Sequence, residues 1–135
     1  MRKFSLKEVS PCFFPVAVAC HDADYRLSWA INNKLSFKLN RIEDFVMQRS
    51  ENMQFPLYSY TDDNSEINYK LVSNRTENGF LISSLRNIDY FMIVSGEIQN
   101  YNSEQLIKDL RKTPLVLTAF LLDDKFTKKF LPLAG

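Results

Sequence analysis

Three segments of the chain are apolar on both of the faces between which a β-strand alternates. They are FFPVAVAC (13–20), DYFMIVS (89–95) and PLVLTAFLL (114–122). In the first segment, Phe14 and Val16 fall on one side of a strand, while Phe13 and Ala17 fall on the other. Strands that are covered on both faces lose the usual alternation of apolar and polar residues, so this pattern predicts three central strands.

A more polar stretch between residues 55 and 73 has the signature of a β-hairpin. Its sequence, FPLYSYTDDNSEINYKLVS, places the turn-forming residues 62–65 between two alternating runs. Pro56 cannot donate a hydrogen bond to a neighbouring strand, so we expect the hairpin at the edge of the sheet. A further short strand is predicted around residues 44–47, within the segment 41–54.

Two segments repeat apolar residues at helical spacing. The first, residues 22–35, can be capped by Asp22 or Asp24, and the second, residues 102–114, by Asn102 or Ser103. Glu104 suits the positive start of the second helix, and Pro114 stops it. The predicted buried stripes are Leu27, Ala30, Ile31 and Leu35 in the first helix, and Leu106, Ile107 and Leu110 in the second.

These elements predict a single α+β domain spanning residues 1–135. The expected architecture is a two-layer sandwich, in which two helices cover a mainly antiparallel mixed β-sheet of about five to six strands. A chain of 135 residues that is 45% hydrophobic can bury one sizeable core, and no repeat or linker demands a second domain.

Charge and composition argue against several classes of partner. The net charge is +1, and no block of like charge is present, so we expect neither nucleic acid nor a membrane surface as partner. The apolar run after the basic start is interrupted and has no small-residue cleavage site, which disfavours a secretory signal. Cys12 and Cys20 lie in or beside apolar residues, as buried free thiols do, and we expect a reduced, cytoplasmic protein.

The sequence ISSLRNIDY (82–90) resembles the signature of the bacterial IPExxxVDY family. Ile82, Asp89 and Tyr90 match that signature directly, and Ile88 replaces its valine conservatively. Further similarity lies in CHDADYRLSWAINNKL, SNRTENGFLI and LTAFLLD, so the resemblance spans most of the chain.

The resemblance implies a small cytoplasmic protein, and it implies no particular activity. Ser83 and Ser84 replace the proline and glutamate of the signature, so the resemblance implies no role for those two positions.

Asp89 is a lone charge at the start of a predicted central strand, where a bare carboxylate would be costly. The interpretation we favour is structural: it accepts backbone N–H groups of the preceding turn, or it pairs with Arg86 or Arg75. The alternative makes Asp89 a general base or a ligand contact, which requires a pocket and a second titratable group.

Other candidate chemistry is weak. Cys20 and His21 are adjacent and would point to opposite faces of a strand, so we predict no catalytic pair. We expect no metal and no cofactor, because no Cys-x-x-Cys pair and no glycine-rich phosphate loop is present. Asn74-Arg75-Thr76 fits the N-glycosylation pattern, and we expect it to be inert in a chain that is not exported.

Two large aromatic residues occupy the face of the first helix that should be solvated. Tyr25 and Trp29 fall opposite the apolar stripe, flanked by Asn32 and Asn33. Either a terminal segment of the same chain covers them, or they line a ligand cleft or a partner interface. The proposed covers are Phe126, Phe130 and Leu131, and on this basis we predict that Trp29 is mostly buried.

Two classes of function follow from these observations. We favour a non-enzymatic domain that self-associates or binds another protein. The alternative is a small-molecule-binding domain or an enzyme with a cleft near four candidate residues: Tyr25, Trp29, Asp89 and Tyr90.

A homodimer is expected because both predicted helices can lie on one face of the sheet, which would leave the other face bare. The second copy would cover the bare sheet face or, as the less favoured route, the aromatic face of the first helix. A monomer would require one terminus to fold across the sheet, or the helices to straddle it.

Overall fold

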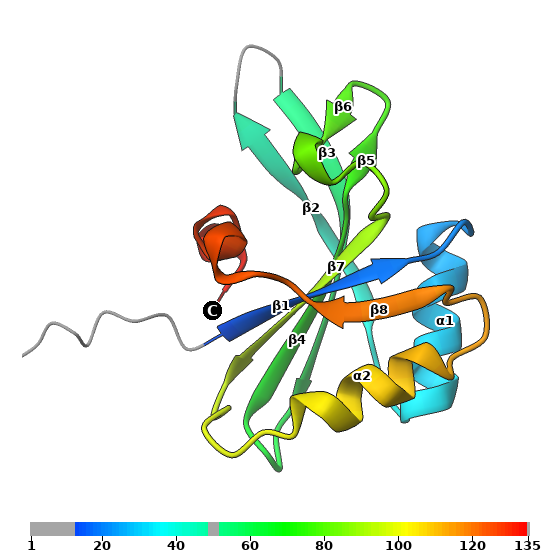
Figure 1. Ribbon diagram of the computed structural model, residues 1–135, viewed down its shortest axis with the longest axis vertical. Helices are drawn as coiled ribbons and strands as arrows, with labels where there is room; N and C mark the ends of the chain where they lie inside the picture. Colours follow the sequence, from blue (N-terminus) through cyan, green and yellow to red (C-terminus); the bar gives the residue numbers. More distant parts are fainter. Residues whose placement is uncertain (1–12, 49–51, 135) are drawn as a thin grey trace, which may run out of the picture.

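The computed structural model describes residues 13–48 and 52–134, which form an α+β fold around one antiparallel sheet (Figure 1). The sheet has six strands in the order β2-β3-β4-β7-β1-β8, and β5 and β6 form a separate two-stranded ribbon. The strands are β1 (Phe13–Ala19), β2 (Asn40–Gln48), β3 (Asn52–Asp62), β4 (Ile67–Ser73), β5 (Arg75–Thr76), β6 (Gly79–Phe80), β7 (Tyr90–Gly96) and β8 (Thr118–Leu121).

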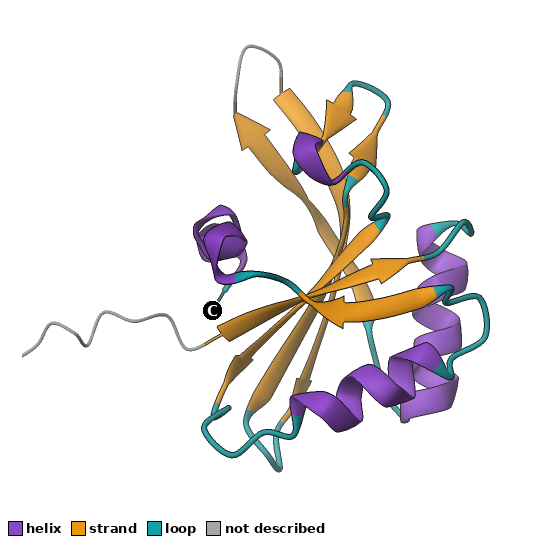
Figure 2. Ribbon diagram, viewed as in Figure 1, coloured by secondary structure: helices purple, strands orange, loops and turns teal. Residues whose placement is uncertain are grey.

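The predicted fold class is confirmed, with one refinement. The expected sheet was mixed, whereas every pairing in the structure is antiparallel. The helices are α1 (Asp24–Leu35), α2 (Ser103–Arg111) and two 3₁₀ segments, η2 (Ser83–Leu85) and η3 (Asp124–Leu133) (Figure 2). In the described part of the chain, no helix combines the length and apolar character needed to cross a membrane.

Two of the three apolar segments form central strands, as predicted. β1 and β7 pair with each other, and their alternating residues enter two separate cores on opposite faces of the sheet. Val16 and Met92 face the helices, whereas Ala17 and Phe91 face the other side. Cover on both faces therefore explains why these strands have no polar side.

The third apolar segment, residues 114–122, was wrongly predicted to be a central strand. Only β8 is extended there, and it ends the sheet, with β1 as its one partner. The preceding residues form a turn in which Val116 donates to the carbonyl of Thr113 and Leu115 has a positive φ of 79°. Apolar content alone could not show that half of this segment is a loop.

The predicted hairpin is β3 and β4, joined by the expected Asp-rich turn, in which the backbone N–H of Asn64 donates to the Asp62 carboxylate. Its predicted edge position is wrong, because β2 lies outside β3 and is longer than the short strand expected there. Pro56 fits inside β3 for two reasons. On one side, the pairing of β3 with β4 begins only at Leu57, and on the other, the register between β3 and β2 shifts at the position opposite Pro56.

The two helices pack on the same face of the sheet, as Figure 1 shows. The predicted apolar stripes of α1 and α2 are buried, namely Leu27, Ala30, Ile31, Leu106 and Leu110, with Leu35 and Ile107 half-buried against the same core. Ser28, which was not predicted, is buried as well. Asn102 caps α2 by accepting the N–H of Gln105. The predicted cap of α1 is wrong, because its N-cap is Ala23, and the carboxylates of Asp22 and Asp24 bind other side chains.

The second face of the sheet is covered, contrary to the expectation that it would be bare. η3 and residues 81–88 lie across it, with the chain end on the opposite side of the sheet from α1 and α2 (Figure 1). Phe130 is fully buried, and its ring meets Phe91 edge to face at 5.0 Å between centroids. Lys70 anchors η3 to the sheet, because its Nζ donates a 3.0 Å hydrogen bond to the carbonyl of Leu133.

The cover that η3 forms over this face removes the reason given for a dimer through the sheet. The C-terminal segment is long enough to close the core within one chain, so the sheet face needs no second copy. The argument for a dimer through that face therefore loses its premise, and the condition set for a monomer, a terminus folded across the sheet, is met. Of the two dimer routes considered, only the aromatic face of α1 is left.

Candidate functional site

The structure separates the four candidate residues into two surfaces, one on each side of the start of α1. Asp89 and Tyr90 line a polar pocket of about 310 Å³, whereas Tyr25 and Trp29 line an apolar groove of about 380 Å³. The single cleft expected near all four is therefore replaced by two separate sites.

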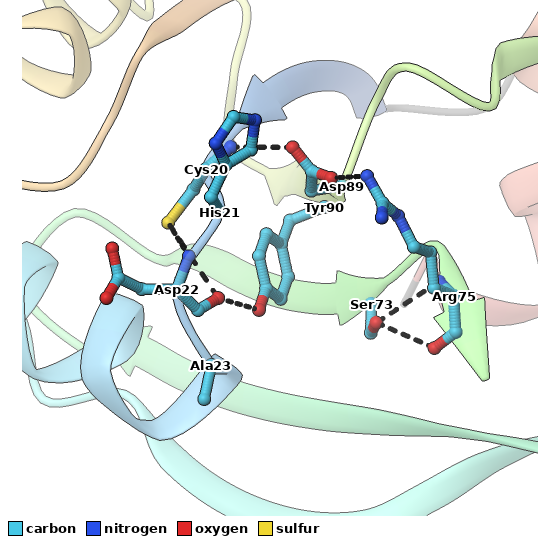
Figure 3. Close-up of a pocket in the computed structure, with 8 residues that line it drawn as sticks. All are labelled: Cys20, His21, Asp22, Ala23, Ser73, Arg75, Asp89 and Tyr90. Carbon is cyan, nitrogen blue, oxygen red and sulfur yellow. Dashed lines mark hydrogen bonds and ion pairs between the residues drawn. The ribbon is translucent and has the colours of Figure 1, made fainter. Parts of the chain in front are cut away.

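The polar pocket, called here the Asp89 pocket, lies where β1 ends and β7 begins (Figure 3). The end of β4 and the start of β5 form its other wall. Its lining residues are Cys20, His21, Asp22, Ala23, Ser73, Arg75, Asp89 and Tyr90.

The Asp89 carboxylate is buried and engaged at both oxygens. Oδ2 accepts the backbone N–H of Cys20 at 2.7 Å, and Oδ1 pairs with the guanidinium of Arg75. The pairing with Arg75 confirms one of the two predicted partners. Arg86 is not a partner, since its guanidinium lies over the ring of Phe80. The N–H group comes from β1 rather than from the preceding turn, because strand pairing places the end of β1 beside Asp89.

Tyr90 and Cys20 are also held in structural positions. The Tyr90 hydroxyl donates to the backbone carbonyl of Asp22 at 2.6 Å, and burial raises the pKa of this hydroxyl well above its usual value. Burial likewise raises the pKa of the Cys20 thiol, which therefore stays protonated at neutral pH and is a poor nucleophile. His21 is exposed at the rim of the pocket. The other cysteine, Cys12, lies outside the described residues.

Asn74 holds the loop that leads to Asp89, a role that the sequence pattern did not predict. It is fully buried, and its side-chain amide donates to the carbonyls of Leu85 and Ile88 while its oxygen accepts the N–H of Ile82. These bonds fix the loop that carries the chain from Arg75 to Asp89. The isolated asparagine in a glycosylation pattern gave no signal of this, since its partners are backbone groups distant in sequence.

The second surface is the aromatic face of α1. The side chains of Tyr25 and Trp29 are 67% and 69% exposed, so the prediction that Trp29 is mostly buried is wrong. The proposed covers lie elsewhere: Phe130 and Phe126 pack on the opposite face of the sheet, and Leu131 is exposed.

An apolar groove runs between this face and the connection from α2 to β8. We call it the α1 groove, and its lining residues are Tyr25, Arg26, Trp29, Ala30, Pro114 and Leu115. The Asn33 side chain donates to the carbonyl of Trp29 at 2.9 Å, and Arg26 is paired with Asp22 at 3.2 Å. The polar groups beside the aromatics thus have partners in α1 or in the residues just before it, so the groove offers mainly apolar contact.

No family model, no curated protein and no solved structure matches the chain.

Proposed function

We propose that this protein is a non-enzymatic interaction domain that associates with a second copy of itself, and that the aromatic face of α1 is its contact surface. The observation that carries the proposal is the exposure of Tyr25 and Trp29 on one side of the same helix, beside an apolar groove. Burying each ring in an interface would contribute about 2–3 kcal/mol of favourable free energy, and in the isolated chain this contribution is absent.

The state of the Asp89 pocket supports a non-enzymatic function. The Asp89 carboxylate is buried, and each of its oxygens accepts a hydrogen bond from a group of the protein, which suits a structural role better than that of a base directed at a substrate. Of the potential nucleophiles in the pocket lining, the Cys20 thiol is buried with a raised pKa, and the Ser73 hydroxyl donates to the carbonyl of Arg75. Each titratable group deep in the pocket thus has a role in holding β1, β7 and α1 together.

The proposal places the protein in the cytoplasm of a bacterium, as the resemblance to the IPExxxVDY family implies. One observation supports a reducing compartment: Cys20 is a free buried thiol. Asn74, the potential glycosylation residue, is fully buried and bonded to the backbone, which fits a pattern that is not modified. Asp89 and Tyr90, which match the signature, both fix the junction between β1, β7 and α1.

Small-molecule binding is the second candidate function, and the unused hydrogen-bond donors at the wall of the Asp89 pocket favour it. Arg75 is 52% exposed and uses one N–H group on Asp89, which leaves further donors at the pocket wall. Thermal unfolding in the presence of a panel of small metabolites would test this function. A stabilising compound whose effect is lost in His21→Ala, a change at the exposed rim, would support it.

Self-association is tested by light scattering coupled to size-exclusion chromatography over a range of micromolar concentrations. We expect a mass that rises with concentration toward twice the 15.8 kDa of one chain. A mass that stays at 15.8 kDa throughout would reject self-association.

A further inference from the structure

We propose that a further pocket, between the end of α1 and the first turns of α2, binds a small organic cation of the methylated ammonium class. This pocket, called here the Asp109 pocket, has a volume of about 250 Å³. Two aromatic side chains, two leucines and three polar side chains at the start of α2 line it. It includes neither Tyr25 nor Trp29, so the proposal goes beyond self-association and does not depend on it.

Two aromatic rings form fixed walls of the Asp109 pocket. The Phe37 ring packs against Tyr69 at 4.3 Å and against Tyr60 at 5.2 Å between centroids. The Tyr101 ring lies 6.2 Å from Tyr69, and the hydroxyl groups of these two tyrosines share a hydrogen bond of 2.9 Å. Because the core behind them holds both wall rings in place, the pocket has a rigid aromatic surface, and the face of an aromatic ring attracts cations.

Asp109 gives the pocket a negative charge, and it is the only charged side chain among the residues that line it. One oxygen of its half-buried carboxylate accepts the side-chain amide of Gln105 at 2.9 Å. Within the part of the chain that the structure describes, Asp109 has no ion-pair partner. In the same part, no lysine or arginine lies over the ring of Phe37 or Tyr101. The attraction of this pocket for a cation is therefore not satisfied by the protein's own basic residues.

The position of Asp109 relative to Tyr101 supports this view. Burial raises the pKa of the Tyr101 hydroxyl, and the negative charge of Asp109 raises it as well. The carboxylate thus acts on the same space that the aromatic ring borders. A cation between them would be attracted both by the charge and by the ring.

The shortage of free acceptors selects a methylated ammonium over a primary one. The side-chain oxygen of Asn102 already accepts the N–H of Gln105, and the Gln105 amide donates to Asp109. A primary ammonium carries three N–H donors, which would lose water here without enough acceptors to replace it. A methylated ammonium has fewer donors, and its methyl groups can contact Leu35 and Leu106.

The size of the pocket limits the ligand. At about 250 Å³, the Asp109 pocket is smaller than the roughly 300–1,000 Å³ of sites that enclose drug-sized molecules. A compound with few atoms makes few contacts, so we expect weak binding, with a dissociation constant on the order of millimolar. Choline, which carries a trimethylated ammonium, is a suitable probe.

The test compares choline with dimethylbutanol, the neutral analogue in which a carbon atom replaces the ammonium nitrogen. Each compound is titrated into the isotope-labelled full chain, and two-dimensional NMR follows the backbone amide signals. Sodium chloride at the same concentrations is the control for salt. We expect choline to shift signals of the Asp109 pocket saturably, and the neutral analogue to bind at least tenfold more weakly, because it has the same shape without the charge.

Two substitutions locate the site. Asp109→Asn removes the charge with little change in shape and should weaken choline binding at least fivefold. The matched control is Glu104→Gln, which removes a negative charge from an exposed position of the same helix outside the pocket and should leave binding unchanged. Phe37→Leu replaces one aromatic wall with an aliphatic side chain and should also weaken binding. The NMR spectrum of each variant shows whether it is folded, and the comparison of the two compounds requires no variant.

Three results would overturn the proposal. The first is the absence of saturable choline binding at tens of millimolar. The second is equal binding of choline and its neutral analogue, since the pocket would then be an apolar site without preference for charge. The third is a choline affinity that Asp109→Asn leaves unchanged, because the cation would then bind elsewhere on the protein.

Discussion

The carboxylate of Asp89 accepts the backbone N–H of Cys20 at 2.7 Å, although 69 residues separate the two in sequence. This bond forms where the ladder between β1 and β7 ends, and where the chain leaves β1 to begin α1. The lone charge at the start of the β7 segment therefore completes the pairing of the two central strands. Arg75 neutralises it from the opposite side.

Removing the acceptor at position 89 should destabilise the fold in a graded way. Asp89→Asn keeps one oxygen for the N–H of Cys20, whereas Asp89→Leu leaves that buried donor unpaired, at a cost of about 1–3 kcal/mol. We expect the free energy of unfolding, measured with chemical denaturant, to fall less for the asparagine variant. A leucine variant as stable as the unchanged protein would contradict this role of Asp89.

Asn74→Ala should be among the more destabilising polar substitutions in the chain. It leaves the N–H of Ile82 and the carbonyls of Leu85 and Ile88 without their side-chain partner, so we expect a loss of roughly 2 kcal/mol or more. The control is Asn78→Ala, at an exposed turn position, which should change stability by no more than about 0.5 kcal/mol. Similar losses in the two variants would argue against the organising role of Asn74.

The C-terminal segment should contribute substantially to stability through one side chain. Phe130→Ala removes a fully buried ring from the second face of the sheet, and such truncations cost about 3–5 kcal/mol. Leu131→Ala, one residue further along and exposed, should cost much less. The comparison is made by thermal and denaturant unfolding. A small loss for Phe130→Ala would mean that the segment is only loosely docked.

Stability should fall in alkaline solution because several buried acids resist ionisation in the folded state. Burial raises the pKa values of Cys20, Tyr69 and Tyr90 above their ordinary values of 9.0 for the thiol and 10.0 for the phenols. Above those values the unfolded chain releases protons that the folded chain retains, so unfolding is favoured as pH rises. Below about pH 9 these three groups should leave stability unchanged with pH.

The tyrosine contribution can be isolated with one substitution. Tyr90→Phe removes one of the retained protons, together with the bond from its hydroxyl to the carbonyl of Asp22. We expect this variant to be less stable at neutral pH, with a shallower decline between about pH 10 and pH 11. Denaturant unfolding at a series of pH values gives both quantities. An unchanged slope would show that Tyr90 ionises as readily in the folded protein as in the unfolded chain.

Local sequence determined the elements whose signals are short-range. Apolar runs without the usual alternation identified β1 and β7, because a strand buried on both faces needs apolar residues at every position. The helical spacing of Leu27 and Ile31, and the Asn102 cap, identified α1 and α2, because these features act within a few turns of one helix. The Asp-rich turn between β3 and β4 was also predicted correctly from its turn-forming residues.

The candidate site was only partly predictable. The need for a partner at Asp89 followed from the cost of burying a bare carboxylate, and Arg75 was one of the two arginines considered. That the donor on the other oxygen is the N–H of Cys20 could not be foreseen, because any backbone N–H group in the chain is chemically equivalent. The same holds for Asn74, whose partners are three backbone groups of the loop that follows it.

The sequence by itself thus determined the α+β class, two of the central strands, the helices and the surplus of apolar surface, all of which depend on residue type and local spacing. Only the tertiary structure decided how that surplus is used. Phe130 and Trp29 are both large apolar side chains, yet Phe130 closes the second face of the sheet and Trp29 stays exposed. Apolar burial has no direction, so the path of the chain after β8 selects which surface is covered.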